Sequence, residues 1–208
     1  MTQKNVLGFF FLINILSLLS GCANPLNRAT FQKYYQAGMG AESQGDYNAA
    51  KENYYRALVN ARIGNLEPQL HASSSYSLGR MLGALCDHEN SEKLLLEALK
   101  FDRESSGPVY MDFFELAYLK YDQNNFAQAA SYFAEAIPLV DNQKFIEADP
   151  GTFIDHFQQY SNALSKIGKN DDAKLYGDRA IKLSELYPNI KPKAKRIDYN
   201  QNCNRKAQ

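Results

Sequence analysis

The sequence predicts an all-α fold of about four helical hairpins that stack into a solenoid. The first observation is helical periodicity: from Tyr34 to Leu58, small or apolar residues recur every three or four positions on both sides of a Gly45-Asp46-Tyr47 turn. The second is that this pattern returns three times along the chain. Since one short hairpin cannot bury both of its faces, the repetition predicts that successive hairpins cover one another.

The four predicted hairpins align on small residues that permit close helix contact. The small residue of the first helix is Gly38, Gly79, Ala117 or Ser161. The small pair of the second helix is Ala50/Ala57, Ser91/Ala98, Ala129/Ala136 or Ala173/Ala180. The residue between each pair is bulky in three repeats (Tyr54, Leu95, Phe133) and is Gly177 in the fourth.

The predicted turns between paired helices align as well. They read Gly45-Asp46-Tyr47, Cys86-Asp87-His88, Asn124-Asn125-Phe126 and Gly168-Lys169-Asn170. Glycine adopts the positive φ that ends a helix, and Asp46 can cap the helix that follows. In the third repeat, Pro138 is expected to end or kink the second helix near Ile137. The residues at 141–152 are then expected to form a loop.

This pattern resembles the tetratricopeptide (TPR) repeat, over residues 31–188. The basic period of that repeat is about 34 residues. Here Ala57, Ala98, Ala136 and Ala180 lie 41, 38 and 44 residues apart, so the helices or links must be longer. The segment Ala98–Pro108 is similar to the long-period repeats of kinesin light chain. The resemblance implies a right-handed superhelix whose first helices line a concave, protein-binding face.

The N-terminus has the pattern of an export signal over residues 1–21. The apolar run Val6–Leu19 is long enough for a signal-peptide core and short for a membrane span. The quartet Leu19-Ser20-Gly21-Cys22 resembles the bacterial lipobox, which implies cleavage before a Cys22 that carries a diacylglycerol. An uncleaved anchor helix is the alternative. Residues 22–30 are expected to form a short lipidated tether with turn chemistry around Pro25.

The C-terminal tail at 189–208 is basic, with six Lys or Arg residues against Asp198, whereas residues 22–188 carry 16 basic and 22 acidic residues. Three interpretations stay open. The tail is solvated, or it caps the acidic last repeat, or it binds anionic lipid or cell-wall polymer. A disulfide between Cys86 and Cys203 would fold the tail back along the solenoid, but only a largely extended tail has the reach.

No pattern in the sequence indicates catalysis or a cofactor. The formal net charge is zero, which argues against nucleic-acid binding. His71, His88 and His156 fall in different repeats without metal-ligand spacing, and there is no phosphate-binding glycine loop. We therefore expect no enzyme activity, no metal or other cofactor and no small-molecule substrate.

The TPR resemblance implies a peptide-binding row along the concave face. Carried over by alignment, the row consists of Tyr35, Met39, Tyr76, Arg80, Phe114, Tyr118, Tyr121, Gln158, Asn162 and Lys166. Aromatic side chains suit peptide recognition, and Arg80 would favour a ligand with an acidic group. Truncating Tyr118 is then expected to weaken binding, and truncating Phe133 to damage the fold. The alternative is that several of these aromatics only pack between helices.

The functional hypothesis is a lipid-anchored, periplasm-facing scaffold for a protein or peptide partner in the cell envelope. Similar repeat lipoproteins assist pilus and secretin assembly or act as adaptors for cell-wall enzymes. The second hypothesis is a structural lipoprotein that self-associates through its open solenoid ends, and light scattering distinguishes the two. An enzyme is the third, and single residues that are essential without loss of fold would support it.

The first testable prediction is that Cys22 is the acylated N-terminus of the mature protein, in the outer membrane. Ala23 follows it, and the aspartate that typically marks inner-membrane retention of lipoproteins is absent. Mass spectrometry of the mature N-terminus checks this. An unmodified Cys22 or an intact Met1 would contradict it.

Overall fold

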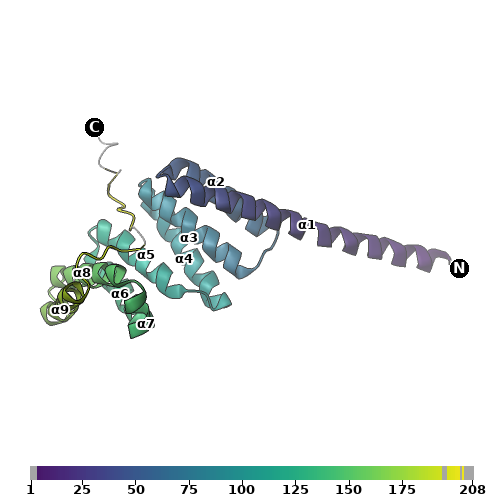
Figure 1. Cartoon of the computed structure of the whole chain (residues 1–208). Coiled ribbons are helices and arrows are strands. Elements are labelled where there is room, and N and C mark those ends of the chain that lie inside the picture. Colours follow the sequence, from purple (N-terminus) through teal and green to yellow (C-terminus); the bar gives the residue numbers. More distant parts are fainter. Residues whose placement is uncertain (1–3, 194–195, 202, 204–208) are drawn as a thin grey trace.

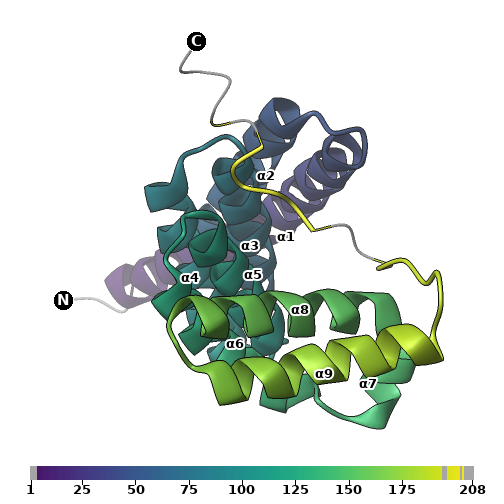
Figure 2. The ribbon, with the colours of Figure 1, turned by 90° about the vertical axis from the view of Figure 1, so that its left-hand side faces the viewer.

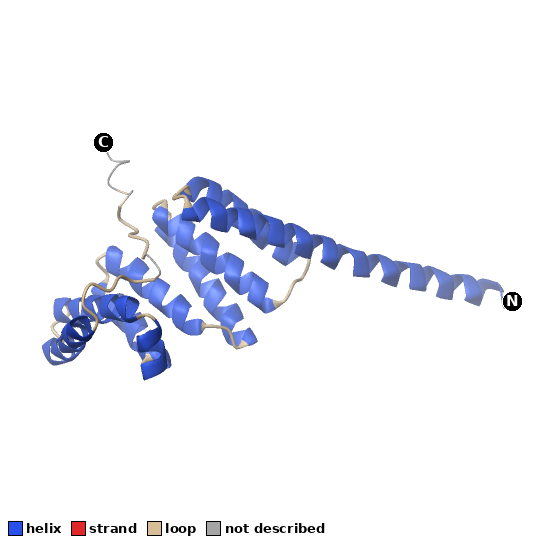
Figure 3. Ribbon diagram, in the orientation of Figure 1, coloured by secondary structure: helices blue, strands red, loops and turns tan. Residues whose placement is uncertain are grey.

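The structure is a computed structural model that describes residues 4–193, 196–201 and 203, with side chains from Asn24 onward. Within these residues it is built of helices, turns and irregular segments without a strand (Figure 3). The helices of the described residues are α1 (Lys4–Ser43), α2 (Tyr47–Ile63), α3 (Pro68–Ala84), α4 (His88–Ser105), α5 (Val109–Asp122), α6 (Phe126–Val140), α7 (Gln143–Ala148), α8 (Pro150–Lys166) and α9 (Asn170–Leu186).

The four predicted hairpins are confirmed as α1/α2, α3/α4, α5/α6 and α8/α9, which stack in chain order (Figure 1). The four turns between paired helices begin with a residue of positive φ, as the alignment predicts: Gly45 (76°), Cys86 (72°), Asn124 (60°) and Gly168 (78°). The next residue caps the following helix in three of them. The side chains of Asp46, Asp87 and Asn125 accept the backbone N–H of Ala49, Asn90 and Gln128.

The small residues lie where paired helices approach each other. A Cβ on Gly38 would stand 2.7 Å from the ring of Tyr54, and one on Gly79 would stand 3.0 Å from Leu95. In the fourth hairpin, Gly177 faces Ser161. The Ser161 hydroxyl donates a hydrogen bond to the backbone carbonyl of Ala173 at 2.6 Å. The eight small positions of the second helices are buried, and so are Tyr54, Leu95 and Phe133. The small residues therefore permit close contact between paired helices, as the sequence predicts.

The expected turn in the tether is wrong. α1 runs without interruption through Pro25, so the described residues of the tether continue the first helix. This part of α1 packs against the α2–α3 link, where Asn27 lies beside Gly64 and Arg28 pairs with Glu67. These tertiary contacts override the local turn preference of the Asn-Pro sequence.

Two expectations for the third repeat are also wrong. α6 continues past Ile137 and through Pro138 to Val140. The proline removes one backbone donor, but Val140 is buried and the N–H of Asp141 still bonds to the Ile137 carbonyl at 2.8 Å. The segment expected as a loop contains the short helix α7, which begins after the capping side chain of Asn142.

The predicted signal peptide and lipid site lie largely outside what the structure describes. Residues 1–3 and the side chains of residues 4–23, Cys22 among them, are not described, so cleavage and acylation stay predictions. Within the described part of the chain, no helix has both the length and the hydropathy that a membrane crossing requires.

The described residues of the C-terminal tail neither extend into solvent nor simply cap the last repeat. Its described residues leave the end of α9, pass over α8 and cross the concave face toward α3 (Figure 2). A disulfide joins Cys203 to Cys86, with their Cα atoms 5.4 Å apart across a sequence separation of 117 residues. The described tail contains no helix or strand, and this extended course supplies the reach that the disulfide requires.

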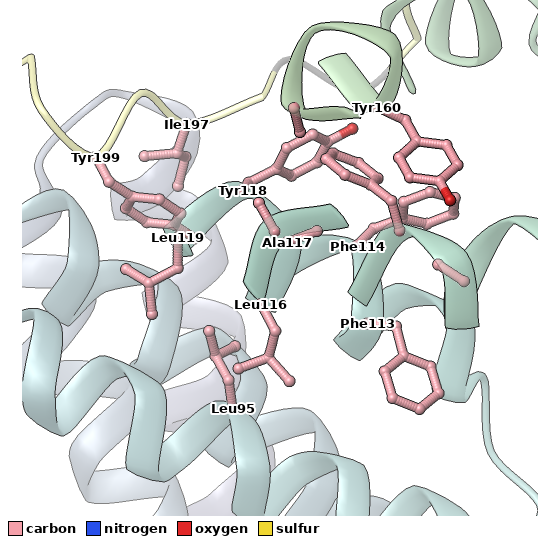
Figure 4. Close-up of a cluster of buried hydrophobic side chains, with 14 of the residues drawn as sticks. Leu95, Phe113, Phe114, Leu116, Ala117, Tyr118, Leu119, Tyr160, Ile197 and Tyr199 are labelled. Atoms are coloured by element: carbon pink, nitrogen blue, oxygen red, sulfur yellow. The ribbon is translucent and has the colours of Figure 1, made fainter. Parts of the chain in front are cut away.

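Helix α5 is the centre of the molecule. Residues Asp112–Lys120 of α5 are buried. Helices α3 and α4 cover one side of α5, whereas α6 and α8 cover the other side, and the tail crosses its C-terminal end. Figure 4 shows Tyr199 and Ile197 of the tail directed toward Leu119, with Phe114 and Tyr118 on a different face of the helix. A helix buried on all sides brings its polar side chains into the interior.

A prediction for the fold concerns Tyr118, which is 7% exposed and packs edge-on against the ring of Phe133 at 5.7 Å. Phe133→Ala and Tyr118→Ala should each destabilise the protein by about 3–5 kcal/mol, because each leaves a cavity. Tyr55→Ala is the matched control, since Tyr55 is 54% exposed. Chemical denaturation gives the three values. A Tyr118→Ala protein as stable as Tyr55→Ala would show that Tyr118 is not a core residue.

A second prediction concerns the disulfide. Cys203→Ser should reduce the free energy of unfolding by about 2–4 kcal/mol, because the unfolded chain loses a long closed loop. Cys86→Ser should have the same effect, and the double variant should lose no more than either single one. Urea titration of the three variants checks this. Additive losses would mean that the two cysteines act independently.

Candidate functional site

The concave face is divided into a part that the tail covers and a part that stays open. The covered part lies over the C-terminal end of α5 and the adjoining ends of α3 and α8. The open part contains two adjoining hollows between α1, α3, α5, α7 and α8.

Asp122, at the end of α5, is the main anchor of the tail. Its carboxylate accepts the guanidinium of Arg196 and, at 2.9 Å, the backbone N–H of Tyr199. The side-chain amide of Asn200 donates to the Asp122 carbonyl. Burial raises the pKa of the Asp122 carboxyl, and the charge of Arg196 opposes that shift. The tail therefore supplies the cation and the donors that this buried acid needs.

Tyr199 fixes the position of the tail along the groove. Its side chain is 0% exposed, and its hydroxyl donates to Glu115 on α5. A Cβ on Gly83 of α3 would stand 2.5 Å from the Tyr199 ring, so a side chain at this position would displace the ring. Glycine at this point of α3 permits the close approach.

The other end of the tail rests on the start of α8. The N–H of Lys193 lies 3.3 Å from both carboxylate oxygens of Asp149, which also caps α8. A Cβ on Gly151 would stand 2.5 Å from the backbone of Lys191. Between these contacts, the Arg196 guanidinium lies over the ring of Tyr118 at 4.7 Å. Gly151 thus accommodates the tail backbone, whereas Gly83 accommodates the ring of Tyr199.

The first hollow, of about 420 Å³, has an aromatic wall formed by α5, α7 and α8. The ring of His156 stacks on Phe114 with centroids 3.6 Å apart, and its Nδ1 hydrogen-bonds the Tyr118 hydroxyl. Burial lowers the pKa of His156 to about 3, so the ring is neutral at physiological pH. Phe153 and Phe145 complete the wall. His156 is an interhelix residue, as its isolated position in the sequence indicated.

The second hollow, of about 410 Å³, lies between α1, α3 and the start of α5. Tyr35 and Met39 of α1 and Tyr76 of α3 provide apolar surface, and Asp102 and Asp112 also line it. Tyr76, Arg80 and Met111 border both hollows, so the two form one continuous groove.

The residues of the predicted binding row have different environments. Tyr35, Met39, Tyr76 and Arg80 line the groove as expected. Phe114 and Tyr118 line it too, but they are only 6% and 7% exposed, and the expectation that packing leaves them free is wrong. Helix α8 and Arg196 of the tail cover their faces.

The remaining residues of the row lie away from the open groove. Tyr121 is beneath Arg196 and accepts a hydrogen bond from Asn162 at 2.6 Å. Gln158 and Lys166 are exposed on α8. Six of the ten residues in the row thus border the open groove, two of them as buried residues, and the other four lie away from it.

Acidic residues line the open groove in excess, which the sequence analysis missed. Asp102, Asp112, Glu115, Asp149, Asp155 and Glu42 border it, against Arg80 and Arg196. Arg80 is paired with Glu42 at 2.6 Å and with Glu115 at 3.4 Å, and Arg196 is paired with Asp122. Arg80 is therefore not available to an acidic ligand, and that expectation is wrong.

One signal in the sequence could have revealed these acids. Asp112, Glu115 and Asp122 recur at helical spacing within the segment of α5, in which Lys120 is the other charged residue. Acidic side chains that the solenoid buries need cationic partners, and the basic tail can supply such a cation.

No protein-family profile matches the sequence, and no curated protein sequence matches it. Solved structures do match. BtubC (BKLC) from P. vanneervenii has a TM-score of 0.65 at 20% identity over 86% of this chain and 68% of its own. MamA has 0.59 at 18% identity, over 82% and 84% of the two chains.

A putative kinesin light chain from Podospora anserina, described as having nearly identical TPR-like repeats, has a TM-score of 0.59. Its identity is 10%, and the match covers 75% of each chain. At such low identities the likeness concerns the fold. The chain thus has the fold of the TPR-like repeat proteins, an all-α repeat superhelix.

Proposed function

We propose that this protein is a lipid-anchored scaffold of the bacterial cell envelope that holds a segment of a partner protein in the open part of its concave groove. The observation that carries the proposal is the pair of adjoining hollows beside the tail, with aromatic walls and an excess of acids. Pockets of this size and lining suit side chains of a bound ligand. The TPR-like fold of its structural neighbours favours a protein partner.

The envelope location rests on two independent features. The first is the N-terminal pattern that resembles a lipobox, which implies an outer-membrane anchor at Cys22 facing the periplasm. The second is the bond between Cys86 and Cys203, since disulfides persist in oxidising compartments such as the periplasm. An assembly factor for pilus, secretin or cell-wall machinery is the class of role that we propose.

Self-association through open solenoid ends has less support. The exposed side of α9, the last helix, carries Asp171, Asp172, Lys174, Asp178, Lys182 and Glu185, which separate its exposed apolar residues. A charged outer helix is the polar cover that ends a solenoid.

Photo-crosslinking in living cells tests the proposed function. A photoreactive residue in place of Met111, which is 39% exposed between the two hollows, should crosslink a discrete envelope protein. The same residue in place of Leu175, which is 56% exposed on α9, is the matched control. No crosslink from position 111, or the same products from both positions, would contradict the proposal.

A further inference from the structure

We propose that the second hollow binds a Lys or Arg side chain of the partner segment, and that the carboxyl pair of Asp102 and Asp112 neutralises its charge. This inference rests on the proposed function and specifies the partner: an extended segment with a basic residue and, for the first hollow, an aromatic or apolar neighbour.

The starting observation is an unusual pair of acids. Asp112 is 0% exposed and Asp102 is 8% exposed, and both border the second hollow. Neither carboxylate oxygen of Asp112 has a hydrogen-bond donor from an amide, an amine or a guanidinium among the described residues. The facing polar group is the carboxyl of Asp102, which can share a proton with it. An unpaired buried carboxylate is costly, so the pair needs either that proton or a cation.

The neighbouring charges do not supply the cation. α1 contributes Glu42, α3 contributes Arg80 and Tyr76, α4 contributes Asp102, and α5 itself contributes Glu115. Arg80 is held by Glu42 and Glu115. Burial, and then the charge of Asp102, raise the pKa of Asp112 well above its usual range. Without a ligand, the pair therefore retains one proton at neutral pH.

A long basic side chain fits this hollow better than a metal ion. In the described part of the chain, no group of three or more acidic, His or Cys side chains gathers to hold a metal. The hollow instead has apolar walls, among them Tyr35, Met39 and Met111, along which the stem of Lys or Arg can lie. The ring of Tyr76 also borders the hollow, with the Arg80 guanidinium already over it at 5.7 Å.

The tail shows how an extended segment occupies this same face. It places the cation of Arg196 on a buried carboxylate and over an aromatic ring, and it crosses helices at Gly83 and Gly151. The open groove repeats these components with its own acids and rings and continues from the tail, since Arg196 borders the first hollow. The groove therefore offers a second site at which a cation of an extended segment can meet a buried carboxylate beside an aromatic ring.

Fluorescence anisotropy with matched peptides tests the inference. The probes are labelled extended peptides with one Phe and one Arg separated by short Gly-Ser spacers, each also made with citrulline, which has the shape of Arg without its charge. The Arg peptide of the best spacing should bind the protein at least about tenfold more tightly than its citrulline twin, because a charged hydrogen bond is lost.

The pH dependence identifies the carboxyl pair as the site. Because the cation replaces the shared proton, affinity for the Arg peptide should rise by up to about tenfold per pH unit as the pH increases, and should level off once the free pair has lost that proton. Asp112→Asn should weaken Arg binding at least about tenfold at pH 8 and flatten this rise. Asp102→Asn is the second variant if Asp112→Asn does not fold. Asp178→Asn on α9 is the control and should change neither the affinity for the Arg peptide nor its pH dependence.

Equal binding of the Arg and citrulline peptides, or a pH rise that survives Asp112→Asn, would overturn the inference. A crosslink from position 111 together with equal peptide affinities would leave the scaffold function standing and remove only the basic ligand. Arg-dependent peptide binding without a crosslink from position 111 would support the basic-ligand site and contradict the proposed scaffold function.

Discussion

The structure depends on satisfying the carboxylates that helix α5 brings into the interior. Asp112, Glu115 and Asp122 lie on a helix with packed neighbours on every side. Burying a charge without a partner costs several kcal/mol, so each acid constrains what surrounds it. Glu115 forms an ion pair with Arg80 and accepts a hydrogen bond from the Tyr199 hydroxyl. Asp122 forms an ion pair with Arg196 and accepts a hydrogen bond from the backbone N–H of Tyr199.

This constraint explains why the basic tail belongs to the fold. Without Arg196 and Tyr199, Asp122 would lose its cation and a backbone donor, and the ring of Tyr118 would lose part of its cover. The disulfide then fixes the far end of the tail beside the turn of the second hairpin. The tail thus completes the core on one half of the concave face and leaves the other half open.

The repeats could be predicted from the sequence because their causes are local. Gly45 and Asp46 specify a turn by themselves, and Gly38 against Tyr54 specifies the crossing of two adjacent helices. Pro25 and Pro138 misled the prediction because contacts from distant residues outweigh a local preference for ending a helix.

The site was less predictable because it depends on the path of the tail. Tyr35, Met39, Tyr76 and Arg80 lie along the open groove, and peptide binding by them stays a prediction. No local pattern indicates that residue 196 returns to residue 122. The acids of α5 were visible in the sequence, whereas their burial follows only from the stacking of all four hairpins. The pairing of Cys86 and Cys203 was among the open alternatives, and the extended course of the tail provides the reach that it needs.

Hydrogen exchange of the tail tests the central claim most directly. In the oxidised protein, the amide of Tyr199, bonded to Asp122 in a buried position, should exchange about as slowly as the amides of α5. Exchange at the rate of an unfolded peptide across residues 196–201, with the disulfide intact, would show that the tail does not occupy the groove.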